Sequence, residues 1–512
     1  MAILGSIVKR TIDLGSKIPK RISTPYREQI KTLKKLMKKA RFTAFGEHYK
    51  FSQILQQKDF VAEFRKNVPA HDYQSMFKNW WYRCLNGEPF VCWPNHIKYF
   101  ALSSGTSEAT SKHIPVTKDT LKQIRKITTR QILGITQFNL PKEIFESGIL
   151  MLGGSTHLNY NGTYFEGDLS GITTGSSPFW FQHFQKPGKR ISQYKDWNSK
   201  LEEITRNAKN WDIGVVCGVP AWIQILFEKI IDYYKVKTIH DIWPNLRIYV
   251  HGGVAIAPYR KSFERLVEHP LFYLDTYLAS EGFIAYQDRP TEDGSMKLNT
   301  DVGIFFECVP FTEDNFDADG NMKKDPASVC LDEVELGKEY AILLSTCSGA
   351  WRYLIGDTVK FTDINEMRVI ITGRTKHFLS LCGEHLSVDN MNRGVIQTAN
   401  EMGVIVNEFT VVGIPHEGLF AHKWYIGTDK QIDAEVFKQK LDEHLNSLND
   451  DYRVERLAAL KDIFVEVLPI DLFFEFLKLQ GKFGSSHKFP RVLKGKVLED
   501  WQKFLESKGF SK

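Results

Sequence analysis

The sequence predicts an α/β protein with a large N-terminal domain at residues 1–375 and a smaller, mobile α+β lid at 376–512. Strand-like and helical patterns alternate as far as residue 370, which is typical of sheets flanked by helices. A shorter mixed set of strands and one helix follows. A chain of 512 residues also exceeds the usual size of one hydrophobic core. We therefore expect two domains of unequal size.

Each expected element is a hydrophobic run bounded by polar or turn residues. Short runs rich in β-branched and aromatic residues indicate strands, whereas apolar residues spaced by three and four indicate a helix. The joint between the domains is expected at Gly373-Arg374-Thr375-Lys376. Strands are expected at 213–217, 247–250, 272–275 and 340–345 in the large domain and at 409–414, 423–428 and 463–468 in the lid, which also contains a helix at 434–448.

Positive charge is concentrated near the N-terminus. Residues 1–50 contain 13 Lys or Arg against 3 Asp or Glu, so the rest of the chain is slightly acidic although the net charge is +6. Within this region, segment 26–40 has an apolar stripe at helical spacing and five lysines largely on other faces. The helix could contact nucleic acid or an anionic membrane. We favour a solvated helix that packs on the body by its apolar stripe, without a nucleic-acid partner.

Several classes of protein are excluded. No run of about 18 apolar residues is present, so we expect no transmembrane segment. The seven cysteines are scattered without a CxxC pair and indicate reduced thiols in the cytoplasm. The P-loop pattern GxxxxGK[ST], the nucleophile elbow GxSxG and the zinc motif HExxH are absent.

One loop has the composition of a phosphate site. Residues 102–115 carry four hydroxyl side chains around one glycine, followed by a lysine. Hydroxyl and N–H donors with one mobile cation can surround a polyphosphate. Clusters of Ser, Thr and Gly are also common in ordinary turns, so the loop alone leaves both interpretations open. The residues are Ser103, Ser104, Gly105, Thr106, Ser107 and Lys112.

Four further sequence segments follow the hydroxyl loop. They are Tyr249-Val250-His251-Gly252-Gly253, then Asp275 to Gly282, Trp351 to Asp357, and Gly373 to Lys376. This order resembles the adenylate-forming superfamily of acyl-CoA synthetases, luciferases and peptide-synthetase adenylation domains. The closer resemblance is to the Gretchen Hagen (auxin-responsive) family of acyl acid amido synthetases, as a bacterial-type member, and it extends over nearly the whole chain.

Individual segments resemble the motifs of that family. The hydroxyl loop is similar to its first nucleotide motif, and a lid segment near the end is similar to its Lys-x-Pro-Arg motif. The second motif is matched by Tyr277-x-x-Ser280-Glu281, the third by Gly356-Asp357, and the lid motif by Ser486 to Arg491 with Lys488 as its lysine.

The third motif departs from the family pattern. It usually reads Tyr-Arg-x-Gly-Asp, but in this chain Leu354 stands at the position of the arginine. Arg352 lies two residues earlier, and the sequence leaves open whether it substitutes for the missing side chain. We therefore assign a role to Asp357 and none to Leu354.

The resemblance implies ATP as a substrate, Mg²⁺ as a cofactor, and a small β-barrel within the large domain. Glu281 would hold Mg²⁺, Tyr277 would stack on adenine, and Asp357 would accept hydrogen bonds from both ribose hydroxyls. Lys488 would reach the α-phosphate from the lid. The remaining implied ATP-binding residues are Ser103, Ser104, Gly105, Thr106, Ser107, Gly252, Gly253, Ser280 and Arg374, with Lys112 as a nearby catalytic cation.

Each of these roles has a purely structural alternative. Glu281 could be a surface carboxylate, Tyr277 a core aromatic residue, and Asp357 part of a turn. Lys488 could belong to a solvated basic face. The occurrence of all these residues in the right order favours the functional interpretation.

The acyl pocket is harder to recognise. Gly218-Val219-Pro220-Ala221-Trp222 follows a strand and opens a helix, and by resemblance Val219 and Trp222 lie near the acyl group. The alternative is a strand-to-helix joint that packs Trp222 in the core. The sequence does not identify the acid.

The predicted function is an ATP-dependent carboxylate–amine ligase that adenylates a carboxylic acid and transfers the acyl group to an amino acid. One alternative is an acyl- or aryl-CoA ligase that uses the same acyl-adenylate. Another is a non-catalytic nucleotide-binding or membrane-associated protein. The expected partners are small-molecule substrates, and the expected oligomeric state is a monomer.

Overall fold

The computed structural model describes most of the chain between residues 24 and 510. The segments outside the described part are 1–23, 104–111, 136–143, 145, 176–183, 254–255, 318–319, 376–378, 380–385, 387, 417–418, 429, 450–451, 454–455, 457–459, 482–488 and 511–512.

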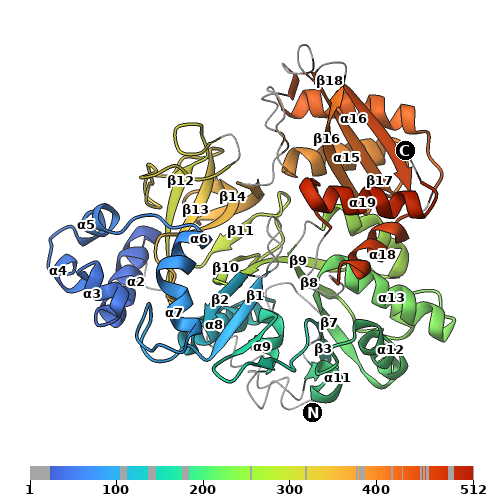
Figure 1. Cartoon of the computed structure of the whole chain (residues 1–512). Coiled ribbons are helices and arrows are strands. Elements are labelled where there is room, and N and C mark those ends of the chain that lie inside the picture. Colours follow the sequence, from blue (N-terminus) through green and yellow to red (C-terminus); the bar gives the residue numbers. More distant parts are fainter. Residues whose placement is uncertain are drawn as a thin grey trace. The chain divides into compact units, whose positions relative to one another are not determined.

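The chain divides into two compact units (Figure 1). Unit 1 contains residues 1–254, 265–315 and 322–370, and unit 2 contains 255–264, 316–321 and 371–512. Two short segments from the middle of the chain therefore belong with the C-terminal part, which the sequence analysis did not predict. The last crossing between the units falls after Ile370, inside a strand.

Unit 1 is built on a sheet of eleven strands in the order β12-β13-β14-β15-β11-β10-β9-β8-β7-β3-β6. The chain crosses into unit 2 within β15, so only the first part of that strand belongs to unit 1. Strands β9, β8, β7, β3 and β6 are parallel, and the others for which pairing is given are antiparallel. The bounds are β3 Gly148–Leu152, β6 Gln185–Lys186, β7 Ile213–Gly218, β8 Ile248–Gly252, β9 Phe272–Ala279, β10 Gly282–Tyr286, β11 Met296–Leu298, β12 Ile304–Pro310, β13 Glu339–Thr346, β14 Tyr353–Asp363 and β15 Arg368–Arg374.

A second sheet of four strands, β2-β1-β5-β4, carries the flanks of the hydroxyl loop. Helices accompany the parallel strands, as the α/β prediction requires. The bounds are β1 Tyr99–Ser103, β2 Lys112–Val116, β4 Asn159–Tyr160 and β5 Phe165–Gly167, with α8 Lys118–Ile135, α9 Leu169–Gly175, α11 Lys189–Ser192, α12 Trp197–Asn207, η4 Ala208–Asn210, α13 Pro220–Tyr234, η5 Ile239–Asp241, η6 Ala257–Tyr259 and α14 Arg260–Leu266.

The N-terminal helices confirm the solvated-helix interpretation of the basic segment. In α2 (Pro25–Ala40), the apolar residues Leu33, Leu36 and Met37 are buried while the five lysines are exposed. Thr24 caps the helix by accepting a hydrogen bond from the N–H of Arg27. The following elements are α3 Ala44–His48, α4 Phe51–Ile54, α5 Phe60–Asn67, α6 Tyr73–Met76, η1 Phe77–Trp81 and α7 Tyr82–Leu85.

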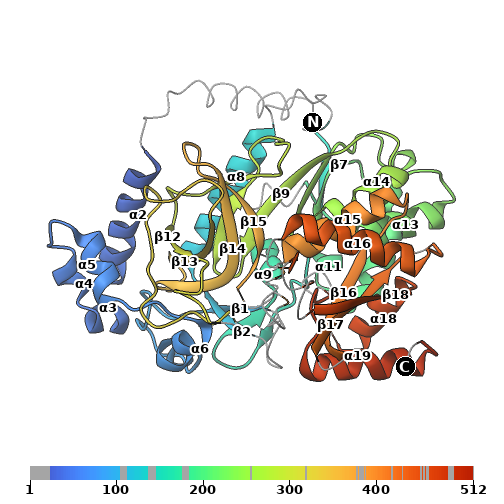
Figure 2. The same cartoon turned by 90° about the horizontal axis from the view of Figure 1, so that it is seen from above.

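Unit 2 is a three-stranded sheet, β16-β17-β18, covered on both faces (Figure 2). Val411 packs with the core that includes α15 and α16, whereas its neighbour Val412 packs with the core that includes α18 and α19. Adjacent residues of a strand point to opposite faces, so each pair of helices covers one face. The bounds are α15 Val388–Glu401, β16 Glu408–His416, β17 Leu419–Gly427, α16 Ala434–Leu448, β18 Leu460–Leu468, α18 Asp471–Leu479 and α19 Gly495–Ser507.

The expected strands and the helix at 434–448 are all present, most of them extended by one to four residues. No helix in the described part of the chain is both long and apolar enough to cross a membrane.

A buried carboxylate ties the mid-chain segment 255–264 to the rest of unit 2. Glu408, at the start of β16, accepts a hydrogen bond from the Tyr259 hydroxyl at 2.6 Å and an ion-paired hydrogen bond from Arg491 at 2.6 Å. Burial, together with the negative charge of Glu408, raises the pKa of the Tyr259 hydroxyl. Tyr259 and Arg491 thus supply hydrogen bonds and an opposite charge to the buried Glu408 carboxylate. Buried charges are tolerated when they are paired and hydrogen-bonded in this way.

Arg352 is the centre of a buried network in unit 1. Its guanidinium donates to both carboxylate oxygens of Glu307 at 3.0 and 3.1 Å, to the carbonyls of Arg65 and Val68 at the end of α5, and to Ser328. The side chains of Arg352 and Glu307 are 6% and 1% exposed. The guanidinium is engaged in joining the end of α5 to the sheet, so its observed contacts are structural.

We predict that Arg352→Ala lowers the free energy of unfolding by about 3–5 kcal/mol, because it leaves Glu307 buried without its partner. Urea denaturation followed by tryptophan fluorescence measures the change. Arg190→Ala is the matched control, since its ion pair with Glu203 leaves the arginine 70% exposed, and it should cost less than about 1 kcal/mol. Equal losses in the two variants would contradict the structural role of Arg352.

Candidate active site

The hydroxyl loop is framed by two paired strands. In the antiparallel pair β1 and β2, Ser103 is the register partner of Lys112, so the loop leaves and re-enters the sheet at neighbouring positions. The half-buried Lys112 has its Nζ 5.2 Å from the centre of the Tyr73 ring. The remaining predicted residues of the loop, Ser104, Gly105, Thr106 and Ser107, lie outside the described residues, as does Lys488 in unit 2.

Two glycines end β8. A Cβ on Gly252 would lie 2.6 Å from the carbonyl oxygen of Thr276 on the adjacent strand, so only glycine fits this close approach. Gly253 has a φ of +85°, which favours glycine as well. Both glycines thus have a backbone reason to be present.

Tyr277 and Asp357 are brought together by the curvature of the sheet. The Tyr277 hydroxyl donates a hydrogen bond of 2.5 Å to Asp357 Oδ2. Their strands, β9 and β14, are separated in the sheet by β10, β11 and β15. Four strand spacings would amount to roughly 19 Å in a flat sheet, too far for these side chains to meet. The antiparallel strands therefore curl strongly, as the expected small β-barrel requires.

Asp357 lies in a β-bulge. Between the register pairs Leu343–Leu354 and Ala341–Thr358, one residue of β13 faces three residues of β14. Gly356, with a φ of +89°, makes this irregular backbone possible. Bulges re-aim side chains and are common next to active sites. Asp357 is thus part of a strand irregularity and not of a simple turn.

Glu281 is buried at the turn between β9 and β10. Ala279 pairs with Gly282, so Ser280 and Glu281 form a two-residue connection. Glu281 is nevertheless only 7% exposed, whereas Ser280 is half-buried. The surface-carboxylate alternative is therefore wrong. A carboxylate at this depth requires cationic or hydrogen-bonding groups around it.

The predicted acyl-pocket residues lie where β7 gives way to α13. Val219 is the N-cap of α13 and is half-buried. Trp222 is 2% exposed, and its ring packs edge-to-face on Trp197 of α12 with centroids 4.9 Å apart. This packing agrees with the core alternative for Trp222. Arg374, the last predicted ATP-binding residue, ends β15 and is half-buried.

Three polar residues near these strand ends, two of them buried, were given no role in the sequence analysis. His251 precedes Gly252 on β8, and Asp275 is its register partner on β9. Lys200 of α12 donates to the Gly153 carbonyl just beyond β3, and burial lowers the pKa of its ammonium group to about 8. The His-Gly-Gly sequence was a usable signal for His251. Nothing in the sequence distinguishes Lys200 from a solvated helix lysine.

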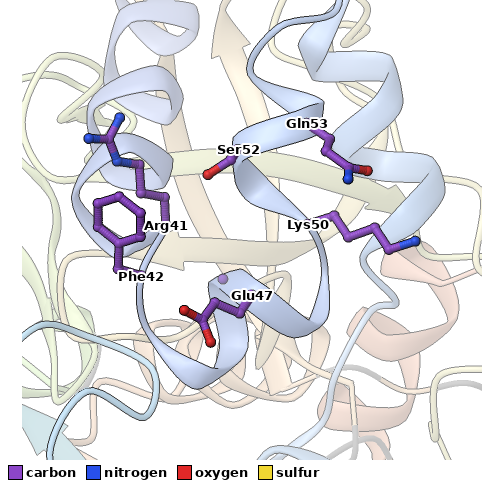
Figure 3. Close-up of a pocket in the computed structure, with 7 residues that line it drawn as sticks. Arg41, Phe42, Glu47, Lys50, Ser52 and Gln53 are labelled. Atoms are coloured by element: carbon purple, nitrogen blue, oxygen red, sulfur yellow. The ribbon is translucent and has the colours of Figure 1, made fainter.

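Two other features of unit 1 contain none of the predicted residues. A shallow pocket of about 270 Å³ near the N-terminus is lined by residues of α2 to α4 and their connections (Figure 3). Cys330, Asp332 and Glu333 lie close enough to share a metal ion. However, Arg65 already neutralises Glu333 at 3.5 Å, and burial raises the pKa of the Cys330 thiol to about 12. The cysteine group is therefore a poor metal site. The pocket residues are Arg41, Phe42, Gly46, Glu47, Lys50, Ser52 and Gln53.

The fold is that of the adenylate-forming enzymes. A structure of 2-hydroxyisobutyryl-CoA ligase in complex with 2-HIB-AMP aligns with a TM-score of 0.58 at 12% identity, over 96% of this chain and 97% of that one. A structure of the GH3.15 acyl acid amido synthetase aligns with a TM-score of 0.77 at 17% identity, over 99% and 96%. At such identities the likeness is one of fold.

The chain belongs to the GH3 family. The family's N-terminal domain model matches residues 16–202, its central domain model matches 298–370, and its C-terminal domain model matches 389–496. Together, the three matches cover most of the chain and follow the family's domain order.

Curated relatives share parts of the sequence. A jasmonoyl–L-amino acid synthetase, JAR4 of Nicotiana attenuata, is 34% identical over 128 residues, which is 24% of this chain and 21% of the relative. The indole-3-acetic acid-amido synthetase GH3.4 of Arabidopsis thaliana is 26% identical over 294 residues, 53% of this chain and 47% of the relative. The chain thus matches between about a fifth and a half of the length of these relatives.

We predict that Tyr277→Phe weakens ATP binding about tenfold, since a hydrogen bond to a charged group contributes about 1.5–3 kcal/mol to the orientation of Asp357. Asp357→Ala should weaken it further. Isothermal titration calorimetry measures both affinities. Tyr286→Phe on the adjacent strand β10, where the side chain lies near Arg130 and Asp301, is the control and should bind ATP normally. Unchanged ATP affinity in Asp357→Ala would rule out its nucleotide role.

Proposed function

We propose that the protein is an ATP-dependent acyl acid amido synthetase, which adenylates a carboxylic acid and transfers the acyl group to the amine of an amino acid. The observation that carries the proposal is the hydrogen bond between Tyr277 and Asp357, because it joins two segments that, by family resemblance, were each predicted to bind the nucleotide. The buried position of Glu281, four residues after Tyr277, supports it. The curated names of the matched relatives favour an amino acid as the acceptor.

The first step activates the acid. Its carboxylate oxygen attacks the α-phosphorus of ATP, an acyl–O–P bond forms, and pyrophosphate leaves. Ser103 to Ser107 would donate hydrogen bonds to the departing phosphates, and Lys112 would supply a nearby positive charge. Asp357 would hold the ribose hydroxyls, with its orientation fixed by Tyr277. The adenine would pack near Tyr277 and beside the strand end at Gly252 and Gly253.

Glu281 would hold Mg²⁺, which prefers one or two carboxylates together with phosphate oxygens and water. The ion would supply positive charge against the phosphate oxygens. The carboxylate fits this role by its chemistry and by its place in the two-residue connection that follows Tyr277 and β9. Ser280 would stay close to the same phosphates as the other residue of the two-residue connection.

Lys488 would complete the site from the lid. The residues that follow it are firmly held: Phe489 is buried against Phe473, and Arg491 is bound to Glu408. A lysine next to such an anchor would be delivered to the α-phosphate when the lid swings about the joint near Arg374. We propose that residues 376–512 form a lid. The mid-chain segment 255–264, which is bound to this part of the chain, would move together with it.

The second step transfers the acyl group. The unprotonated amine attacks the acyl carbon, the bond between that carbon and the phosphate oxygen breaks, and AMP leaves. The enzyme would act mainly by positioning the two reactants, since the adenylate is already a reactive electrophile. The proposal includes a monomeric, cytoplasmic enzyme.

Carboxylate-dependent exchange of labelled pyrophosphate into ATP tests the first step. We expect exchange with at least one acid from a panel of aromatic, indole and fatty acids, and its loss when EDTA removes Mg²⁺. Lys488→Ala should lower the exchange rate roughly a hundredfold, since the lysine acts chiefly in the transition state, with ATP affinity nearly unchanged. The exposed Lys494→Ala is the matched control. ATP binding without exchange for any acid would count against an enzyme.

The acceptor is tested by the release of AMP. With its acid and ATP supplied, the protein should release AMP faster when free amino acids are added and should form an acyl-amino acid amide detectable by mass spectrometry. The alternative of a CoA ligase predicts stimulation by coenzyme A and a thioester product. A thioester with no response to any amino acid would overturn the amide proposal and leave adenylation standing.

A further inference from the structure

His251 is a buried side chain without a hydrogen bond at the end of β8. Its imidazole is 1% exposed, and in the described part of the chain neither Nδ1 nor Nε2 has a hydrogen-bond partner. Buried polar groups are nearly always hydrogen-bonded, so such an exception requires a physical reason. Completion by a reactant that binds during catalysis is one such reason.

The other buried histidines of unit 1 show what a structural histidine looks like in this fold. His240 uses both ring nitrogens, at 2.9 Å from the Leu246 carbonyl and 3.0 Å from the N–H of Glu268. His71 contacts the Trp351 carbonyl at 3.0 Å, and burial lowers its pKa to about 4. Among the described residues His251 has no comparable backbone partner, so the hydrogen bonding seen there does not explain its place in the fold.

Asp275 lies next to His251 and is itself oriented. The two residues are register partners on parallel strands, and His251 Nδ1 is 3.4 Å from Asp275 Oδ1. The same oxygen accepts the N–H of Thr276 at 2.8 Å. A carboxylate beside one ring nitrogen selects the tautomer with the proton on that nitrogen and leaves the other nitrogen as a proton acceptor. Such contacts are often long before the reactants bind.

This pair belongs to the same strand ends as the candidate nucleotide site. Gly252 follows His251 directly, and Asp275 and Tyr277 are two residues apart on β9, so they share a face of the sheet. Tyr277 in turn binds Asp357. The carboxyl ends of parallel strands are where open α/β sheets bind their ligands. The imidazole is therefore built into the edge at which the adenylate would form.

We propose that His251, oriented by Asp275, accepts the proton of the acceptor amine in the second step. This inference rests on the proposed function. An amino acid arrives with its amine protonated, and an ammonium group has no electron pair for attack on the acyl carbon. None of the residues assigned to the first step is a neutral base near physiological pH, whereas an imidazole is.

The step balances as follows. His251 Nε2 takes one proton from the ammonium group, and the freed electron pair forms the C–N bond with the acyl carbon. The bond between that carbon and the phosphate oxygen of AMP breaks, and AMP carries the electron pair away. The amide nitrogen then loses its second proton to solvent, and the imidazolium also returns its proton to solvent. Asp275 remains ionised beside the imidazolium and stabilises its charge.

Two acceptors distinguish this role from a structural one. An amino acid needs its proton removed, whereas hydroxylamine is largely unprotonated at neutral pH and attacks without a base. For His251→Ala, the ratio of the AMP-release rate with the amino acid to that with hydroxylamine should fall at least about a hundredfold relative to the wild type. Pyrophosphate exchange in the same variant reports whether the adenylate still forms.

Equal losses with both acceptors, or no loss with the amino acid, would overturn the proposal. Asp275→Asn provides a second test that keeps the side-chain volume, and it should lower the same ratio by a smaller factor. His240→Ala is the matched control because it removes a buried histidine whose hydrogen bonds are structural. It should leave the ratio unchanged. Absence of exchange in the wild type would instead reject the proposed adenylation itself.

Discussion

The hydrogen bond from Tyr277 to Asp357 is the constraint on which the candidate site depends. It joins a strand of the parallel half to a strand of the antiparallel half across three intervening strands. Such a contact is possible only because the sheet curls, and the curl encloses the large core of unit 1, in which Tyr277 takes part. The bulge at Gly356 turns Asp357 toward that contact. Core packing and the geometry of the candidate site are therefore coupled here: Tyr277 is a core residue, as the structural alternative expected, and its hydroxyl also orients Asp357.

Much of this arrangement could be predicted from the sequence, and the part that could not has a common cause. The strands, the lid helix and the solvated basic helix were evident because hydrophobic periodicity reports burial within one element. Contacts between residues far apart in the chain leave no such pattern. Arg352 and Glu307 lie 45 residues apart, and Tyr277 and Asp357 lie 80 apart. The sequence therefore left the role of Arg352 open, whereas the structure assigns it to a buried ion pair.

Buried polar residues are a second feature that hydrophobic periodicity does not predict. Glu281 and Lys200 would pass for exposed charges in any pattern analysis, because charged residues are rarely fully buried. Their burial is imposed by a two-residue connection in one case and by packing of α12 in the other. His251 is similar, since its hydrogen-bonding state becomes visible only when the neighbouring strand is placed beside it. The residues of greatest chemical interest are thus those for which the surroundings, and not the residue types, carry the information.

The division of the chain adds a mechanical consequence. Residues 255–264 belong to unit 2 and are held there by the bonds of Tyr259 and Arg491 to Glu408. They begin two residues after Gly253, and Arg491 follows Lys488 by three. Any movement of unit 2 as a body would therefore act on the chain that follows His251. Gly253, with its positive φ, is suited to absorb the resulting backbone rotation.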